Sequence, residues 1–200
     1  MIDGLFPDEI NLNLPDSDIT YYPNFIERAT ADSYFQSLKE ETPWQQDNIT
    51  VFGKTYVQPR LTALYGNNGK PYSYSKLVMA PHKFTPMLLE IKNKVETCTG
   101  AVFTTCLLNL YRNGQDSNGW HADNEKELGK NPIIASVTLG QERFFHLKHR
   151  KDKNLKQKIL LQHGSLLLMK GATQEHWLHQ VPKTARVINE RINLTFRIIT

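Results

Sequence analysis

The chain has 200 residues, a hydrophobic content of 40% and a formal net charge of +4. This size and composition fit one compact domain with a substantial core, so no second domain is needed. The sequence holds no apolar run near the roughly 20 residues that cross a bilayer. Residues 1–14 carry acids and a proline where a signal peptide needs a basic start and an apolar run. We therefore expect an intracellular protein without a membrane partner, cytoplasmic or, in a eukaryotic host, nuclear.

The two cysteines, Cys98 and Cys106, exclude a disulfide framework and a cysteine metal cluster. A pI near 9.0 is a modest indication of a polyanionic partner. The charge is concentrated in residues 148–158, where five lysines and one arginine face a single acid, Asp152. Such a segment could bind phosphates. A solvated hairpin tip explains the same charges equally well.

Two helices are expected in the first half of the chain. Three prolines interrupt the first 28 residues, which we expect to be irregular and to wrap the domain. An apolar stripe predicts a helix over about 31–41. A second helix is expected to begin after Thr85 as N-cap, with Pro86 in its first position, and to end at Gly100.

The second half of the chain has short β-patterns separated by turn signals. They cover residues 103–111, 133–139, 143–149, 158–162, 165–170, 176–181 and 191–199. Many short strands after two helices predict an α+β fold that is mainly β: a double-stranded β-helix (jelly-roll) core supported by N-terminal helices. The mouth of such a core is a natural ligand pocket.

His121 and Asp123 are candidate metal ligands, because residues two apart on an extended segment point to the same side. With His179 they form two imidazoles and a carboxylate, the set that leaves coordination positions open on non-haem Fe(II). The chief rival of His179 among the seven histidines is His176, which would lie on the opposite face of a strand. We favour His179 because its segment leads into the strand 191–197.

Residues 191–197 alternate strictly between polar and apolar side chains. The polar positions are Arg191, Asn193, Thr195 and Arg197. Two guanidinium groups aimed the same way suit a small dianion, and beside iron a dicarboxylate suggests 2-oxoglutarate. An edge strand whose polar face meets water is the common alternative. The neighbouring histidine and aspartate ligands favour the dianion. His146 and His149 are assigned to the basic segment, where a cationic imidazole would help to bind phosphate.

The sequence resembles the AlkB-type Fe(II)/2-oxoglutarate dioxygenases that repair alkylated nucleic acids, and is most similar to the DNA-acting, animal-like branch. The resemblance covers about residues 50–199. It is carried by Asn109-Leu-Tyr111, Trp120-His-Ala-Asp123, Pro132-Ile-Ile-Ala-Ser-Val, His163-Gly-Ser-Leu, Trp177-Leu-His179 and Arg191-Ile-Asn-Leu-Thr-Phe-Arg197.

The resemblance implies that His121, Asp123 and His179 are the catalytic iron ligands. It further implies that the distal carboxylate of 2-oxoglutarate is held by Arg191, Tyr111 and Asn193, and its chelating end by Arg197 and Asn109. The implied cofactors are Fe(II), 2-oxoglutarate and O2. The implied reaction decarboxylates 2-oxoglutarate to succinate and hydroxylates an N-methyl group, which leaves as formaldehyde.

The same resemblance implies a surface for an extruded base. Tyr72, Tyr74 and Arg60 match a nucleotide-recognition lid, in which Tyr74 would sandwich the base against His121. Phe52, in Val-Phe-Gly, matches a finger that plugs the vacated site in duplex DNA. Ordinary strand packing is the alternative for these aromatic residues.

Asn124 departs from the family pattern, which often has aspartate at this position. Glu125 is retained and could accept a hydrogen bond from the exocyclic amine of a base. We expect a single, monomeric AlkB-like domain over 1–200, with an N-terminal extension (1–49), a nucleotide-recognition lid (50–80) and the jelly-roll core (100–200).

The expected function is oxidative demethylation of 1-methyladenine and 3-methylcytosine in DNA, a direct reversal repair. One alternative is an RNA demethylase of the same chemistry. Another is a non-catalytic module that binds damaged DNA, which would be expected to have lost a metal ligand or an arginine; the sequence keeps all of them.

Overall fold

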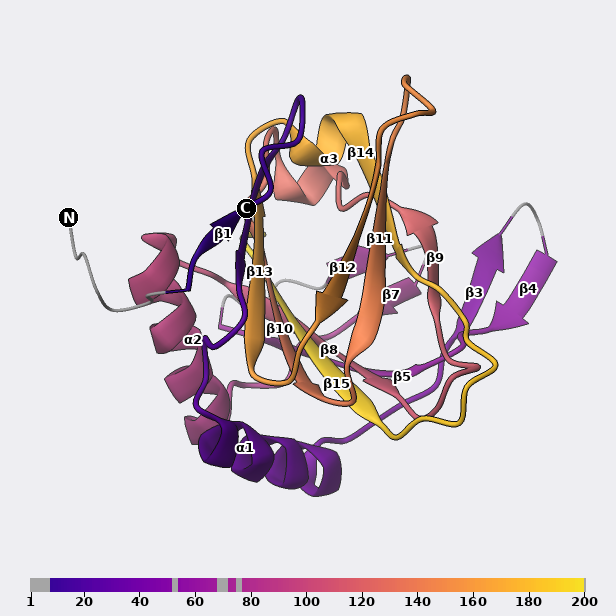
Figure 1. The fold of residues 1–200 in the computed structure, drawn as a ribbon. Helices are drawn as coiled ribbons and strands as arrows, with labels where there is room; N and C mark the ends of the chain where they lie inside the picture. The colour runs from indigo at the N-terminus through magenta and orange to yellow at the C-terminus, as the bar shows by residue number, and fades with distance from the viewer. Residues whose placement is uncertain (1–7, 52–53, 68–71, 75–76, 200) are drawn as a thin grey trace.

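The computed structural model describes residues 8–51, 54–67, 72–74 and 77–199, in which two antiparallel sheets face each other (Figure 1). In spatial order, the strands of the main sheet among these residues are β1 (Ile10–Asn11), β2 (Asp18–Tyr22), β13 (Ser165–Lys170), β10 (Ile134–Gly140), β15 (Arg191–Arg197), β8 (Thr105–Tyr111) and β5 (Leu61–Gly66). Those of the minor sheet are β12 (Lys156–Leu161), β11 (Arg143–His149), β14 (Trp177–Val181) and β9 (Asn118–His121). This arrangement confirms the expected, mainly β, jelly-roll fold.

Four further strands form two hairpins that pair with neither sheet among the described residues. They are β3 (Asn48–Val51) with β4 (Lys54–Val57), and β6 (Tyr72–Tyr74) with β7 (Leu77–Met79). The helical elements are α1 (Arg28–Glu41), α2 (Pro86–Thr99), the single turn α3 (Thr173–His176) and the 3-10 turn η1 (Lys126–Leu128). No helix of the described ranges is long and apolar enough to span a bilayer.

The two expected helices are confirmed and lie against the main sheet (Figure 1). The side chain of Thr85 caps α2 by accepting the N–H of Leu88 at 3.2 Å, and Gly100 ends it with a φ of 70°. Helix α1 begins three residues before the expected start, because the carboxylate of Glu27 accepts the N–H of Thr30 and caps it there.

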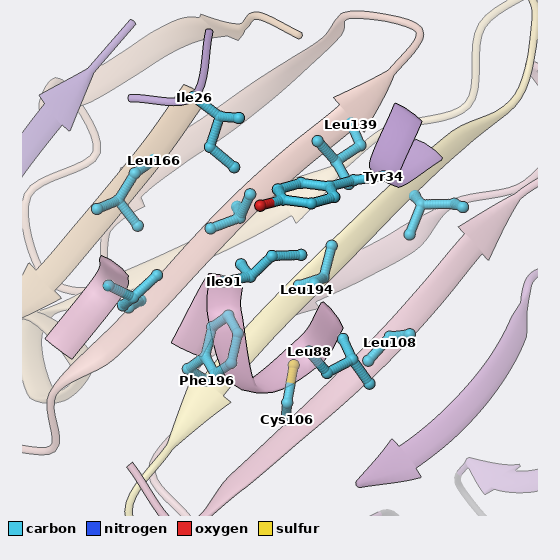
Figure 2. Close-up of a cluster of buried hydrophobic side chains, with 14 of the residues drawn as sticks. Ile26, Tyr34, Leu88, Ile91, Cys106, Leu108, Leu139, Leu166, Leu194 and Phe196 are labelled. Atoms are coloured by element: carbon cyan, nitrogen blue, oxygen red, sulfur yellow. The ribbon is translucent and has the colours of Figure 1, made fainter. Parts of the chain in front are cut away.

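The hydrophobic core has two layers, one on each side of the main sheet. On the helix side, Ile192, Leu194 and Phe196 of β15 pack with residues of both helices, including Leu88 and Ile91 (Figure 2). The second layer lies between the two sheets. Strand β15 is therefore buried along its whole length, between β10 and β8, which excludes the alternative of an edge strand in water.

The expectation that the first 28 residues are irregular is wrong for β2, which pairs with β13 in the main sheet. Its side chains are buried on both faces: Ile19 and Tyr21 enter the layer between the sheets, while Tyr22 enters the helix layer. The neighbouring prolines flank this strand rather than interrupt it. The segment expected as a lid, 50–80, likewise contributes β5 to the main sheet, paired with β8.

The packing of the helix layer predicts that two adjacent leucines of α2 contribute very differently to the free energy of unfolding. Leu88 is fully buried, whereas Leu89 is 41% exposed. We expect Leu88→Ala to lower the free energy of unfolding by about 2–5 kcal/mol, because it removes buried methyl groups and leaves a cavity. Leu89→Ala, the matched control, should cost less than about 1 kcal/mol. Urea denaturation measures both, and equal losses would contradict this packing.

Candidate active site

His121, Asp123 and His179 come together between the two sheets. His121 ends β9 and lies opposite His179 of β14 in the strand register, and Asp123 follows β9 by two residues. One ligand atom from each residue lies within 4.8 Å of the others, and the two imidazole centroids are 4.2 Å apart. The three side chains could therefore hold one metal ion.

The hydrogen bonds of His121 leave the correct nitrogen available for a metal. Its Nδ1 lies 2.7 Å from the carbonyl oxygen of Gly119, which can only accept, so Nδ1 carries the proton. The lone pair is then on Nε2, which lies 3.9 Å from Oδ1 of Asp123. In metal sites, a histidine commonly donates the N–H of its other ring nitrogen to a neighbouring group, which fixes the tautomer in this way. The Nδ2 of Asn118, 3.1 Å from Nε2, contacts the same lone pair in this structure.

The local electrostatics keep His179 and Asp123 in their metal-binding protonation states. Burial, reinforced by the nearby His121, lowers the pKa of His179 to about 3, so the imidazole is neutral at pH 7. Burial alone would raise the pKa of Asp123, but the charge of Arg197 and the two histidines outweigh it and lower this pKa to about 2. A neutral imidazole and a carboxylate are the forms that bind a metal.

Hydrogen bonds hold one carboxylate oxygen and the backbone N–H of Asp123, which leaves the second carboxylate oxygen for a metal. Its Oδ2 accepts a hydrogen bond from Nη2 of Arg197 at 2.9 Å, while the buried Oδ1 has no hydrogen-bond partner in the described ranges. The backbone N–H of Asp123 donates to Oε1 of Gln174 at 2.9 Å. Sequence reasoning missed Gln174, because nothing in its spacing from Asp123 indicates contact. A buried, unsatisfied carboxylate oxygen beside two imidazoles fits a divalent metal.

The dianion side of the pocket is built on β15 and β8. Arg191 pairs with Tyr111 and Asn193 with Asn109 in the register, so the four side chains share one face. Nη2 of Arg191 donates to Oγ1 of Thr138 at 2.8 Å. Its buried Nε and Nη1 lack hydrogen-bond partners within the described residues.

The charge of Arg191 persists despite its burial. Desolvation lowers its pKa to about 10, which still leaves the guanidinium protonated at neutral pH. A buried cation with two unsatisfied N–H groups is costly alone and fits a carboxylate. Asn193 is already oriented, since its Nδ2 donates to Oγ of Ser136 at 2.7 Å and to the carbonyl of Val137 at 3.1 Å.

One pocket joins the two halves, because its lining includes the three metal-ligand candidates and the expected dianion residues. These lining residues are His121, Asp123, His179, Asn109, Tyr111, Arg191, Asn193 and Arg197. Arg60 lines the same pocket: it is buried and its Nε donates to Oδ1 of Asn109 at 2.7 Å. It therefore lies in the pocket wall next to a residue expected to contact the cosubstrate.

The remaining substrate residues are placed less completely. Glu125 is half-buried and immediately precedes η1. Tyr72 and Tyr74 belong to β6, and nothing is described of their side chains. Phe52 lies outside the described residues, so its expected finger role stays a prediction.

Two expectations about the other histidines are wrong. His149 is not a surface phosphate contact: it is buried, and its Nδ1 accepts the N–H of Asp152 at 3.0 Å. His176 does not lie on a strand face, because it ends α3, where its ring lies parallel to that of His149 at 5.9 Å between centroids. Alternation along a strand could not place it, since the strand begins one residue later.

The metal-ligand geometry predicts the effect of Asp123→Asn. The amide is a much poorer metal ligand than the carboxylate, so we expect Mn(II) affinity to fall about 100-fold or more. Asp116→Asn is the matched control, because it removes another buried carboxylate, paired with Arg112. Calorimetric Mn(II) titration should separate the variants, and wild-type affinity in Asp123→Asn would refute the assignment.

The unsatisfied guanidinium predicts that Arg191→Gln weakens 2-oxoglutarate binding about 100-fold, because charge-assisted hydrogen bonds are lost. Arg191→Lys should recover part of the loss, since it restores the charge without the fork. The control is Arg112→Gln, which removes a guanidinium outside the pocket lining. Titration of Mn(II)-loaded protein with 2-oxoglutarate measures the effect. An equal loss in both glutamine variants would argue against a specific role.

Comparisons with known proteins agree with this geometry. The sequence model of the 2OG-Fe(II) oxygenase superfamily matches residues 18–197. "Alpha-ketoglutarate-dependent dioxygenase alkB homolog 3" of Bos taurus is 43% identical over an alignment 192 residues long that covers 92% of this chain. "DNA oxidative demethylase ALKBH2" of Homo sapiens is 36% identical over 188 residues, covering 89% of this chain and 72% of that protein.

This chain spans only 66% of the length of the bovine relative. A solved structure of OsALKBH1 superimposes with a TM-score of 0.63 over 90% of this chain and 96% of that one; at 18% identity it supports the fold alone. The chain belongs to the 2OG-Fe(II) oxygenase superfamily and to its AlkB-type branch, and its cofactors are Fe(II), 2-oxoglutarate and O2.

Proposed function

We propose that the chain demethylates 1-methyladenine and 3-methylcytosine in DNA. The observation that carries this proposal is one pocket in which the three metal-ligand candidates, with the unsatisfied Oδ1 of Asp123, lie beside the buried guanidinium of Arg191, whose Nε and Nη1 have no hydrogen-bond partner among the described residues. A relative named as a DNA oxidative demethylase, 36% identical over 89% of this chain, supports DNA as the substrate.

The residues of the pocket have separable tasks in this reaction. His121, Asp123 and His179 would hold the metal, and a set of three protein ligands would leave room on it for the cosubstrate and O2. Arg191, beside Tyr111 and Asn193, would orient the cosubstrate through its distal carboxylate. Arg197 fixes the rotamer of Asp123 through the 2.9 Å hydrogen bond.

When bound, Fe(II), 2-oxoglutarate and O2 supply the oxidation: 2-oxoglutarate becomes succinate and CO2, and the N-methyl group is hydroxylated and leaves as formaldehyde. The protein's task is to exclude competing water and to present the methyl group. Leu107, Ile134 and Phe145 line the pocket with apolar surface. The ring of Phe145 stacks on that of His179, with 5.1 Å between the ring centroids.

A methyl group on a Watson–Crick nitrogen must leave the base stack to reach this pocket. The side chain of His121 is 20% exposed, whereas that of Asp123 is 2% exposed, so the base would approach from the side of His121. We assign Tyr72, Tyr74 and Glu125 to contacts with the extruded base, and Phe52 to the gap in the duplex. We propose a single domain in which the N-terminal extension (1–49) and the lid (50–80) precede the jelly-roll core (100–200), with β2 and β5 joining the main sheet of that core.

The basic segment 148–158 supports a nucleic-acid substrate. It forms the end of β11, the following turn and the start of β12, and Lys151 and Lys153 are exposed in that turn. Exposed lysines here could neutralise phosphates near the pocket. We propose that the protein acts as an intracellular monomer on DNA. The same chemistry on RNA is the alternative, and the intact ligand set disfavours a non-catalytic binding module.

The proposal is tested by incubating the protein with Fe(II), ascorbate, 2-oxoglutarate and methylated oligonucleotides. We expect succinate, formaldehyde and restored bases from 1-methyladenine and 3-methylcytosine DNA, in single or double strands, and less from the matching RNA. Asp123→Ala should abolish turnover and serves as the control for non-enzymatic oxidation. Mass spectrometry of the oligonucleotide measures base restoration. No restored base on any DNA would sink the proposal, and faster repair of RNA would favour the alternative.

A further inference from the structure

The outer face of the minor sheet, which points away from the pocket, is cationic and aromatic. Along β11 the buried positions alternate with outward positions at Phe144, His146 and Lys148. The neighbouring β12 adds Lys156 and Lys158, both exposed. The helices α1 and α2 lie against the main sheet instead and leave this face uncovered (Figure 1). We name these five residues, together with Trp120 of β9, the lysine-aromatic face.

Two aromatic rings on this face are each contacted by a lysine. Nζ of Lys148 lies 4.2 Å from the ring centroid of Trp120, and Nζ of Lys158 lies 3.8 Å from that of Phe144. Trp120 is 39% exposed and Phe144 is 40% exposed. Each ring therefore offers π-surface to a ligand, with a cation that can move from the ring to an anion beside it.

The positive charges of this face are not balanced within it. Lys148 lies directly opposite Lys156 in the register, and His146 lies opposite Lys158. Like charges at directly opposed positions destabilise a sheet. Desolvation and then the charge of Lys158 lower the pKa of His146. A polyanion bound here would relieve this repulsion.

The lysine-aromatic face is continuous with the mouth of the pocket. Trp120 directly precedes His121 on β9, and alternation along the strand places Trp120 outside and His121 inside. Strand β9 is also the edge of the minor sheet. A chain that leaves the pocket over this edge therefore meets Trp120 first. At the other end, Phe144, His146 and Lys158 line a hollow whose only acid among the described residues is Glu142.

We propose that the lysine-aromatic face binds the single-stranded nucleic acid that continues from the extruded base. Bases stack on Trp120 and Phe144, while Lys148, Lys156 and Lys158 neutralise phosphates. Aromatic platforms beside cations are how proteins bind single strands with little sequence preference. This inference rests on the proposed function for its direction, since the strand enters from the pocket.

The test compares lesion-free single strands of roughly 5 and roughly 15 nucleotides, a range that spans typical binding-site sizes. Fluorescence anisotropy gives the gain in affinity from the short to the long strand. We expect Trp120→Ala, and separately Lys148→Gln with Lys158→Gln, to reduce that gain about tenfold. Trp120→Phe should retain most of it, because the ring can still stack. Thermal unfolding of each variant identifies any that fail to fold, and the lysine pair tests the face without altering Trp120.

The matched control is Lys94→Gln, on α2. Its Nζ also lies over an aromatic ring, that of Phe25 at 5.4 Å, but on the helix side of the molecule. The inference would be overturned if the face variants kept the wild-type increase in affinity from the short to the long strand, or if Lys94→Gln reduced that increase equally. It would also be overturned if affinity rose with length for duplexes but not for single strands. If no methylated base is restored while the face variants still lose length gain, the proposed function fails and the binding face stands. If methylated bases are restored but the face variants keep the wild-type increase in affinity with strand length, the proposed function stands and the binding face fails.

Discussion

Among the buried guanidinium groups of this molecule, those of Arg191 and Arg197 lie between the two sheets, and their desolvation determines how the pocket is built. Both belong to β15, whose apolar side chains face the helices while its polar side chains face the minor sheet. Arg197 is compensated by the carboxylate of Asp123. Arg191 lies beside no carboxylate among the described residues: it donates to the hydroxyl of Thr138, and its Cζ lies 5.2 Å from the ring centroid of Tyr111. A buried charge of this kind favours the ligand-bound state over the empty one.

The same two arginines connect the metal site to the cosubstrate site. One carboxylate oxygen of Asp123 accepts a hydrogen bond from Arg197 and the other is left toward the histidines, so Asp123 contacts both the cosubstrate site and the metal site. The N–H of Asp123 is held by Gln174 from α3, and α3 leads directly into β14 with His179. One short segment thus contacts Asp123 through Gln174 and leads into the strand that carries His179.

Much of the site could be predicted because it follows from alternation along single strands. The period of two over 191–197 depends only on the pleat, and the structure keeps it. Asp123 lies two residues beyond the end of β9, and it still joins His121 and His179 as expected. The ends of α2 were also predictable, since Thr85 and Gly100 act through local backbone geometry. Pairing between distant segments was not. Nothing local distinguishes β2 from an irregular segment, and Gln174 acts through a contact that only the folded chain creates.

The hairpins β3–β4 and β6–β7 pair with neither sheet among the described residues. They therefore share no ladder of backbone hydrogen bonds with the strands that carry the metal and dianion residues. Apart from Met79 of β7, which is buried in the layer between the sheets, substitutions in these hairpins can accumulate without moving β15 or β14, because loops on a rigid scaffold tolerate change. The strands that carry the residues for oxidation are thus separate from the hairpins proposed for substrate recognition. Related enzymes can therefore acquire new substrates while they keep one reaction.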